Sequence, residues 1–127
     1  MKGLGQDPWS EKRGFRPSLE KSNIMPKVNH IVLLAFKEQD PKAIGDLFAE
    51  LAGLKELVPG LLSFQGGPYS SPEGLHKGFT HAFTMIFADE SARDAYLPHP
   101  EHERVKNLLL PVIDDVIAFD FLLPEGA

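Results

Sequence analysis

The chain has 127 residues, 43% of them hydrophobic and 24% charged, with no cysteine and a formal net charge of −5 at pH 7. This length and composition are those of one globular domain with a core of its own, and the lack of cysteine excludes disulfides, thiolate metal sites and cysteine nucleophiles. The longest strongly apolar run, 31–36, is far shorter than the roughly 20 residues that cross a bilayer, so we expect no membrane partner.

The charge is unevenly divided along the chain. Residues 1–26 carry five basic and three acidic side chains, whereas residues 27–127 carry eight basic and fifteen acidic ones. An acidic domain without a cluster of Lys and Arg argues against nucleic acid as a partner, because phosphate binding depends on clustered positive charge. We expect a cytoplasmic protein, since residues 1–26 lack the apolar core of a secretory signal and contain the acidic residues that transit peptides avoid.

The chain divides into two parts. Residues 1–26 mix Gly, Pro, Ser, Lys and Arg without a hydrophobic period, so we predict a flexible N-terminal extension there. The alternative is that Trp9 and Phe15 dock on the domain or on a second subunit. We predict that residues 27–123 form the folded domain.

Residues 28–36 predict the first strand, because branched and aromatic residues fill the segment. Nearly every position is apolar, so we expect both faces of this strand to be covered. Asp40 and Pro41 then begin a helix as its N-cap and first helical residue. Pro59 and Gly60 end this helix, whose apolar stripe follows the helical period: Ile44, Leu47, Phe48, Leu51, Leu54 and Val58.

Residues 61–65 predict a short second strand, followed by a long connection in which Gly, Ser and Pro favour turns. His76 lies in this connection, where we expect it to be exposed to solvent. Residues 78–88 predict a third strand by their alternation. One face of this strand carries Phe79, His81, Phe83, Met85 and Phe87, and the other carries Thr80, Ala82, Thr84 and Ile86.

Asp89 caps a second helix, which Pro98 interrupts and Pro100 restarts as far as Leu110. Residues 112–123 predict the fourth strand. The resulting order is β-α-β-β-α-β, which is that of the ferredoxin-like α+β sandwich, a four-stranded antiparallel sheet with two helices on one face.

One face of this predicted sheet is left bare, although its strands are apolar on both sides. A monomer would therefore expose a larger apolar patch than globular proteins usually tolerate. We predict that the bare face meets the same face of a second copy in a homodimer, which gives a dimeric α+β barrel.

Four of the five histidines lie in or beside the predicted strands and the broken helix. His30 and His81 lie in the two segments that would form the central strands, each on the same face as the apolar residues around it. Either histidine alone is most often a structural residue that bonds to the backbone, but the two together are less easily explained by structure alone.

The densest group of reactive side chains is the segment 96–102, Tyr-Leu-Pro-His-Pro-Glu-His. Two prolines break the helix there and hold the neighbouring rings at fixed angles. A neutral imidazole can accept a proton and a tyrosine hydroxyl can donate a hydrogen bond to a developing oxyanion, so this segment is a candidate for acid–base catalysis. The structural alternative is that His99 caps the restarted helix and Tyr96 packs in the core.

The same segment offers only a weak metal pattern. His99 and His102 are three residues apart beside two glutamates, whereas the zinc hydrolase motif places two histidines four apart with a glutamate between them. The chain also lacks a dinucleotide fingerprint, a phosphate loop and a Gly-x-Ser-x-Gly elbow. We expect no metal and no cofactor.

Four segments together carry a family resemblance: Val28-Asn29-His30-Ile31-Val32, Gly78-Phe79-Thr80-His81-Ala82-Phe83, Tyr96-Leu97-Pro98-His99-Pro100-Glu101-His102 and Val116-Ile117-Ala118-Phe119-Asp120-Phe121. With its V-x-H, G-[FY]-T-H and Y-x-x-H-P-x-H motifs, the chain resembles the stress-responsive A/B barrel domain (Dabb) family over about residues 27–121. The resemblance implies a ferredoxin-like subunit whose sheet pairs with that of a second subunit to close a dimeric α+β barrel.

The resemblance also implies a chemistry, although most members of that family have no assigned activity. Plant polyketide cyclases of the olivetolic acid cyclase type, which share this barrel, use a Tyr and the last His of the third motif for an intramolecular aldol condensation. Those positions match Tyr96 and His102, which would make His102 the general base and Tyr96 its hydrogen-bonding partner, the two catalytic residues. The substrate-binding residues would be His30, His81, His99 and Phe83.

We therefore predict a homodimer that binds a small, apolar, carbonyl-bearing molecule in its barrel, with cyclase- or lyase-like acid–base chemistry as its candidate activity. Two alternatives stay open. One is a non-enzymatic stress-response protein, in which the histidines are structural and the barrel only stabilises the oligomer. The other is a cofactor-independent monooxygenase, an activity found among other dimeric α+β barrels.

Overall fold

The computed structural model describes residues 25–124, so nearly all of the predicted extension, including Trp9 and Phe15, lies outside the described residues. The elements follow the predicted order, with the broken helix present as two helices. They are β1 (Val28–Phe36), α2 (Pro41–Leu57), β2 (Leu61–Pro68), β3 (His81–Phe87), α3 (Glu90–Tyr96), α4 (Pro100–Leu109) and β4 (Ile113–Leu122). Within residues 25–124, no helix is long and apolar enough to cross a membrane.

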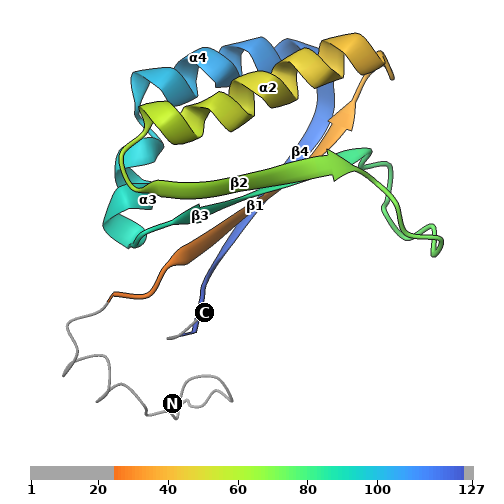
Figure 1. Cartoon of the computed structure of the whole chain (residues 1–127). Coiled ribbons are helices and arrows are strands. Elements are labelled where there is room, and N and C mark those ends of the chain that lie inside the picture. The colour runs from red at the N-terminus through yellow and green to blue at the C-terminus, as the bar shows by residue number, and fades with distance from the viewer. Residues whose placement is uncertain (1–24, 125–127) are drawn as a thin grey trace.

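The four strands form one antiparallel sheet in the order β2-β3-β1-β4, which makes β1 and β3 the central strands, as predicted. Helices α2 and α4 lie side by side over one face of the sheet (Figure 1). The predicted ferredoxin-like α+β architecture is confirmed.

Local sequence signals explain where the helices begin. The side chain of Asp40 accepts hydrogen bonds from two backbone N–H groups of the first turn of α2, at 3.1 and 3.3 Å, and Pro41 takes the first helical position, where a missing N–H costs nothing. Asp89 caps α3 in the same way at 2.8 Å. These caps satisfy backbone donors that have no partner within the helix.

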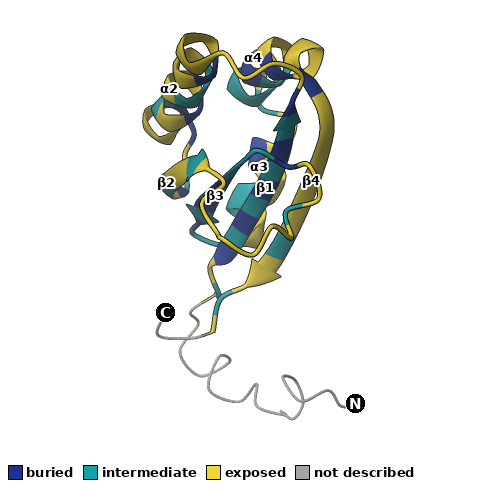
Figure 2. Ribbon diagram, turned by 90° about the vertical axis from the view of Figure 1, so that its right-hand side faces the viewer, coloured by how far each residue is buried: buried dark blue, intermediate teal, exposed yellow. Residues whose placement is uncertain are grey.

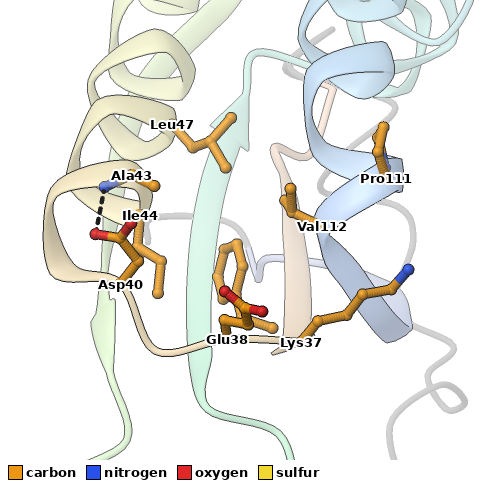
Figure 3. A pocket seen from close by; sticks show the side chains of 9 residues that line it. Lys37, Glu38, Asp40, Ala43, Ile44, Leu47, Pro111 and Val112 are labelled. Atoms are coloured by element: carbon orange, nitrogen blue, oxygen red, sulfur yellow. Dashed lines mark hydrogen bonds between the residues drawn. The ribbon is translucent and has the colours of Figure 1, made fainter.

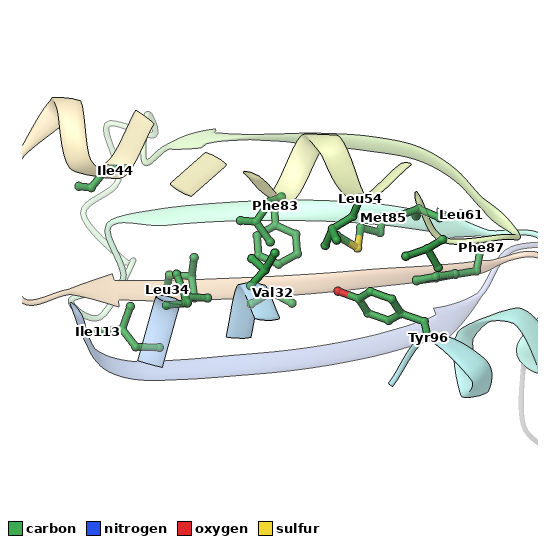
Figure 4. Packing of buried hydrophobic residues seen from close by; sticks show 14 of the residues in the cluster. Val32, Leu34, Ile44, Leu54, Leu61, Phe83, Met85, Phe87, Tyr96 and Ile113 are labelled. Atoms are coloured by element: carbon green, nitrogen blue, oxygen red, sulfur yellow. The ribbon is translucent and has the colours of Figure 1, made fainter. Parts of the chain in front are cut away.

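The core lies between the sheet and helices α2 and α4. Buried and half-buried residues alternate along β1, so that one set faces the helices and the other faces the open side of the sheet. The inward set of β3 (Phe83, Met85 and Phe87) is buried in the same way. Figure 4 shows how these side chains meet those of the helices, the most deeply buried being Val28, Leu34, Leu54, Met85, Phe87, Tyr96 and Val105.

The predicted end of the second strand at residue 65 is wrong. β2 extends to Pro68, and its residues 66–68 pair with β3 as far as His81. β2 is an edge strand. A proline can be accommodated there because one side of the strand forms no backbone hydrogen bonds to a neighbouring strand. Long-range pairing therefore outweighs the turn preference of Gly and Pro in this segment.

Two other predicted boundaries shift by a few residues. β3 begins at His81, because Lys77 and Gly78 adopt positive φ angles of 56° and 87° and still belong to the preceding turn. At the other end of the domain, α4 stops at Leu109, and a short 3-10 helix (Leu110–Val112) precedes β4. Pro111 lies within this last turn, so it tightens the helix end rather than marking a clean stop.

The expectation that His76 is exposed is also wrong. His76 is half-buried in the connection between β2 and β3, and its ring stacks on that of Tyr69 with centroids 3.7 Å apart and planes 20° apart. The Tyr69 hydroxyl accepts a hydrogen bond from the backbone N–H of Gly74 at 2.8 Å. Local contacts thus stabilise this connection, for which the composition predicts only a series of turns.

We predict that Gly66 is required for the close packing of β2 against the core. A Cβ atom at this position would lie 2.7 Å from Phe48 Cε2 and 2.7 Å from Phe83 Cβ. Gly66→Ala is therefore expected to destabilise the fold by about 1–3 kcal/mol, measured as a lower urea midpoint. Gly67→Ala is the matched control, since its Cβ would meet nothing within 4 Å. Equal midpoints for the two variants would contradict the prediction.

The outer face of the sheet is apolar, as predicted. Phe119 of β4 lies opposite Ile31 of β1, and Ile117 lies opposite Leu33. Ile117, Phe119 and Phe121 are 44%, 61% and 42% exposed, and β4 is the longest exposed stretch of strand in Figure 2. Such a row of large exposed side chains marks an interaction surface.

Candidate functional site

A cavity of about 280 Å³ lies between α4 and the sheet, and we call it the main cavity. Most of its lining side chains are aliphatic, from β1, α2, α4 and β4. Four of the predicted site residues line it together: His30, Phe83, Tyr96 and His102. A mainly apolar hollow with a few convergent polar groups is the usual form of a small-molecule site.

The helix break at Pro98 brings two of these residues together. Tyr96 is the last residue of α3, and His102 lies in the first turn of α4. Their ring centroids are 4.4 Å apart, and the hydroxyl end of Tyr96 points over β1 toward Val32, which also lines the main cavity (Figure 4). An unbroken helix would separate side chains six residues apart on different faces, so the break builds this pair.

The hydrogen bond of His102 decides which of its nitrogens can act as a base. Its Nδ1 lies 2.8 Å from the backbone carbonyl oxygen of Leu97. A carbonyl only accepts, so Nδ1 carries the proton and Nε2 holds the free lone pair of the neutral ring. Burial lowers the pKa of His102 below its ordinary value, aided by the nearby positive charge of Lys106. His102 is therefore a neutral base at pH 7.

The pKa of Tyr96 is shifted in the opposite direction. Tyr96 is only 2% exposed, and burial raises its pKa to about 12. The hydroxyl therefore stays protonated and can donate a hydrogen bond at neutral pH. Neighbouring groups whose pKa values are pushed apart form an acid–base pair that operates near pH 7.

His30 is held by two residues that the sequence analysis did not select. Its Nδ1 lies 2.6 Å from Asp120 Oδ1, and the other oxygen of Asp120 accepts a hydrogen bond from Arg93 Nη1 at 2.8 Å. A carboxylate accepts only, so Nδ1 of His30 is the donor of this hydrogen bond. The signal that could have found Asp120 is that it is the single charged residue in the apolar run 116–123.

We predict that Asp120 stabilises the fold in a pH-dependent way. Burial by itself would raise its pKa, but the hydrogen bonds from Arg93 and His30 outweigh burial and lower the pKa below its ordinary value. The carboxylate therefore contributes stability above the unfolded-state pKa of about 3.9, and this contribution is lost as the pH falls through the lower folded-state pKa. Asp120→Asn should cost about 1–3 kcal/mol at pH 7.

Urea unfolding of both proteins from pH 7 to pH 2.5 measures this effect. The gap between wild type and Asp120→Asn should be widest at neutral pH and should narrow below about pH 4. Asp94→Asn is the control, because Asp94 also bonds to Arg93, at 2.8 Å, but its side chain is 67% exposed. A gap that does not change with pH would contradict the role assigned to Asp120.

His81, expected in the same pocket as His30, is not among the residues that line the main cavity. Both histidines face the helices, but they lie at different positions along the paired strands. His81 lies opposite Leu34, and His30 lies opposite Met85. His81 instead lines a separate hollow of about 470 Å³ with Phe48, Gly66 and neighbouring residues. There its Nδ1 is 2.9 Å from Thr80 Oγ1, and burial lowers its pKa.

His99 is also placed outside the lining of the main cavity. It is the N-cap of α4, and its Nδ1 accepts a hydrogen bond from the backbone N–H of Glu101 at 3.0 Å. This is the structural role that the sequence analysis left open for His99. Within residues 25–124, no three His, Asp or Glu side chains are grouped so that they could hold a metal ion.

A third hollow, of about 390 Å³, lies where β1 passes into α2 (Figure 3). Its charged side chains are Lys37, Glu38 and Asp40, and the carboxylate of Asp40 is engaged in capping α2. None of the predicted site residues lines it. The main cavity is therefore the candidate functional site.

Comparison with known families and sequences identifies relatives over the whole described domain. The profile of the family described as Stress responsive A/B Barrel Domain matches residues 28–123. The stress-response A/B barrel domain-containing protein HS1 of Arabidopsis thaliana is 33% identical over 95 residues, which cover 74% of this chain and 87% of that protein.

Solved structures of other proteins have a fold similar to that of this chain. A dimeric ferredoxin-like protein from Jannaschia sp. CCS1 superposes with a TM-score of 0.67 and 28% identity, over 75% of this chain and 97% of that chain. The hydroxynitrile lyase of Passiflora edulis superposes with a TM-score of 0.73, over 80% of this chain and 97% of that chain. Its 22% identity makes this second likeness one of fold alone.

Proposed function

Because the chain belongs to the stress-responsive A/B barrel domain family, we propose that it binds a small, largely apolar, carbonyl-bearing molecule in the main cavity. His102 is the general base and Tyr96 the hydrogen-bond donor of this site. His30 and Phe83 contact the ligand beside them. The activity is cofactor-independent acid–base chemistry of the cyclase or lyase kind.

The chemical step is proton transfer next to a carbonyl group. Nε2 of His102 takes a proton from the carbon beside the carbonyl, and the C–H bonding pair moves to form an enolate. The negative charge collects on the carbonyl oxygen, where the Tyr96 hydroxyl donates a hydrogen bond to it. In an intramolecular condensation the enolate carbon then attacks a second carbonyl of the same molecule, and His102 returns the proton to the alkoxide formed.

One observation carries this proposal: the rings of Tyr96 and His102 meet 4.4 Å apart in an apolar cavity, and burial shifts their pKa values in opposite directions. Burial of the residues alone would not distinguish a site from a core. The opposed pKa shifts favour a site, because perturbed titratable groups in a hollow are typical of functional sites.

A thermal-shift screen of the full chain tests the proposal. A ligand present at 100 times its Kd stabilises the native state by about 2.7 kcal/mol, a shift of several degrees in Tm. Aryl ketones such as 4-phenylbutan-2-one and aromatic carboxylates are suitable probes. We expect shifts with wild type that the double variant Tyr96→Phe/His102→Ala loses.

The non-enzymatic alternative is favoured by one contact. Tyr96 packs on Phe87 with centroids 5.0 Å apart, as part of the core cluster. If its role is structural, the screen stays empty while the same double variant melts at a lower temperature than wild type. That pair of results would replace the proposed activity with a purely structural barrel.

We also propose that the chain forms a homodimer through the outer face of its sheet. The Jannaschia protein, 28% identical, is dimeric, and the exposed apolar row of β4 offers the surface for such a contact. A closed two-fold arrangement would bury this row against its own copy.

A further inference from the structure

The charges around the main cavity point to the class of ligand. We propose that Lys106 makes the main cavity selective for small apolar molecules that carry a carboxylate group. This inference rests on the proposed function, because it assumes that the main cavity binds a ligand, and it adds what that ligand must be.

Lys106 is placed at the rim of the main cavity by the helix that carries the base. His102 and Lys106 are one turn apart on α4, so both lie on the face that lines the cavity. The side chain of Lys106 is 40% exposed, which is typical of a lysine whose methylene stem covers apolar surface while its ammonium group reaches water. A ligand in the main cavity would therefore have an ammonium group beside its solvent end.

Lys106 gives the main cavity a positive charge that no acidic side chain of its described lining offsets. Among the described residues that line it, His30, His102 and Lys106 carry basic nitrogens, and none is a carboxylate. Asp120 lies behind His30, where it is engaged with both His30 and Arg93. A hollow lined by one sign of charge and low-dielectric walls concentrates ligands of the opposite sign. This is notable in a chain whose net charge is −5.

The positive charge of Lys106 also reaches the base. It is one of the causes that lower the pKa of His102, after burial. A ligand carboxylate beside Lys106 would offset this effect and would place the rest of the molecule against Tyr96 and His102. Lys106 therefore positions and selects the ligand, and it does not itself take or donate the transferred proton.

The volume of the main cavity limits the size of the ligand. A dry apolar cavity of about 150 Å³ holds one benzene molecule, so a cavity of about 280 Å³ takes roughly twice as many heavy atoms. A phenyl ring with a short carboxylate-bearing side chain fits this volume. Molecules such as trans-cinnamate are therefore suitable probes.

The existing partner of Lys106 does not prevent this role. Its Nζ lies 3.1 Å from a carboxylate oxygen of Glu103, in a pair whose side chains are 40% and 45% exposed. Such exposed pairs contribute at most about 1 kcal/mol, so little stability is lost when Lys106 leaves Glu103 for a ligand carboxylate. Removing Glu103 should free Lys106 and should strengthen the binding of an anion.

Calorimetry with an isosteric pair of probes tests the inference. trans-Cinnamate and cinnamamide have the same shape, and only the first is charged at pH 7. With wild type at low ionic strength, we expect cinnamate to bind about tenfold more tightly than cinnamamide. Lys106→Met should remove this preference, and Glu103→Gln should increase it.

Lys55→Met is the matched control. Lys55 is a half-exposed lysine on α2 beside a glutamate, at 3.9 Å, and it does not line the main cavity. This variant should keep the wild-type preference, and added salt should weaken cinnamate binding without changing that of cinnamamide.

The outcomes separate the inference from the proposed function. If both probes bind wild type equally, or if the preference for cinnamate survives Lys106→Met, the role of Lys106 is overturned while the main cavity stands as a binding site. If neither probe binds wild type, the proposed function fails and the inference fails with it.

Discussion

Replacing His102 with alanine is expected to reduce proton exchange at the carbon beside a bound ketone by about 100- to 10,000-fold, to the rate of buffer alone. The expectation follows from the bond between His102 Nδ1 and the Leu97 carbonyl, which leaves Nε2 as the free base. Tyr96→Phe removes one donor to the oxyanion and should cost about 100- to 1,000-fold. Tyr96→Phe keeps the aromatic ring and His102→Ala leaves a small apolar side chain, so we expect both variants to remain folded.

Deuterium uptake from D2O into 4-phenylbutan-2-one, followed by NMR, measures this exchange. The probe is a neutral ketone, so its result does not depend on the selectivity assigned to Lys106. His76→Gln is the control, since His76 lies in the connection between β2 and β3, stacked on Tyr69. Wild-type exchange no faster than in buffer would contradict the acid–base proposal, as would full exchange in folded His102→Ala.

The pH profile of this exchange has a defined direction. Burial lowers the pKa of His102 below its ordinary value near 6.5, so the base is mostly neutral at pH 7 and above. The rate should be level through neutral pH and should fall as the pH drops through the lowered pKa. Tyr96, with a pKa raised to about 12, stays a donor throughout. The acid limb should disappear in His102→Ala.

Phe119→Lys is expected to convert the proposed homodimer into a monomer. Phe119 is 61% exposed in the single chain and lies opposite Ile31 of β1 on the outer face of the sheet. Because a two-fold interface repeats every substitution, the variant would place two unpaired ammonium groups in one apolar contact, at a cost of several kcal/mol. Each 1.4 kcal/mol is a tenfold loss of affinity.

Sedimentation velocity over a range of protein concentrations measures the result. Leu57→Lys is the matched control, because Leu57 is also a large exposed apolar residue, 50% exposed, but lies at the end of α2 on the helix side. We expect wild type and Leu57→Lys to sediment as dimers and Phe119→Lys as a monomer. Dimers of Phe119→Lys would exclude the outer sheet face as the interface.

The fold was predictable because its signals are local. The alternation along β1 and β3 assigns each side chain to a face without reference to any other segment, and capping residues such as Asp40 and Asp89 mark helix starts by their chemistry. The helix break at Pro98 has the same local cause. These signals also place His30, Phe83, Tyr96 and His102 near a common core face, which is why the sequence could select them.

The distribution of the histidines over cavities could not be predicted in this way. Face parity puts His30 and His81 on the same side of the sheet, but position along the strands depends on the pairing of β1 with β3, in which His81 lies opposite Leu34 and not beside His30. Register arises from contacts between segments far apart in the chain. The extension of β2 to Pro68 has the same origin, since pairing with β3 overrode the local preference for a turn.

The partners of the site residues also depend on long-range contacts. Asp120 meets His30 although the two are 90 positions apart in the sequence, and Arg93 reaches the same carboxylate from α3. A periodic pattern carries no information about which charged side chain will face which ring. Sequence periodicity was therefore enough to predict the layers of this protein. It was also enough to predict the two faces of the sheet, one apolar and open and the other covered by helices. The pairing of strands was needed to show which polar groups share the main cavity and how their protons are held, because those contacts exist only once distant segments are brought together.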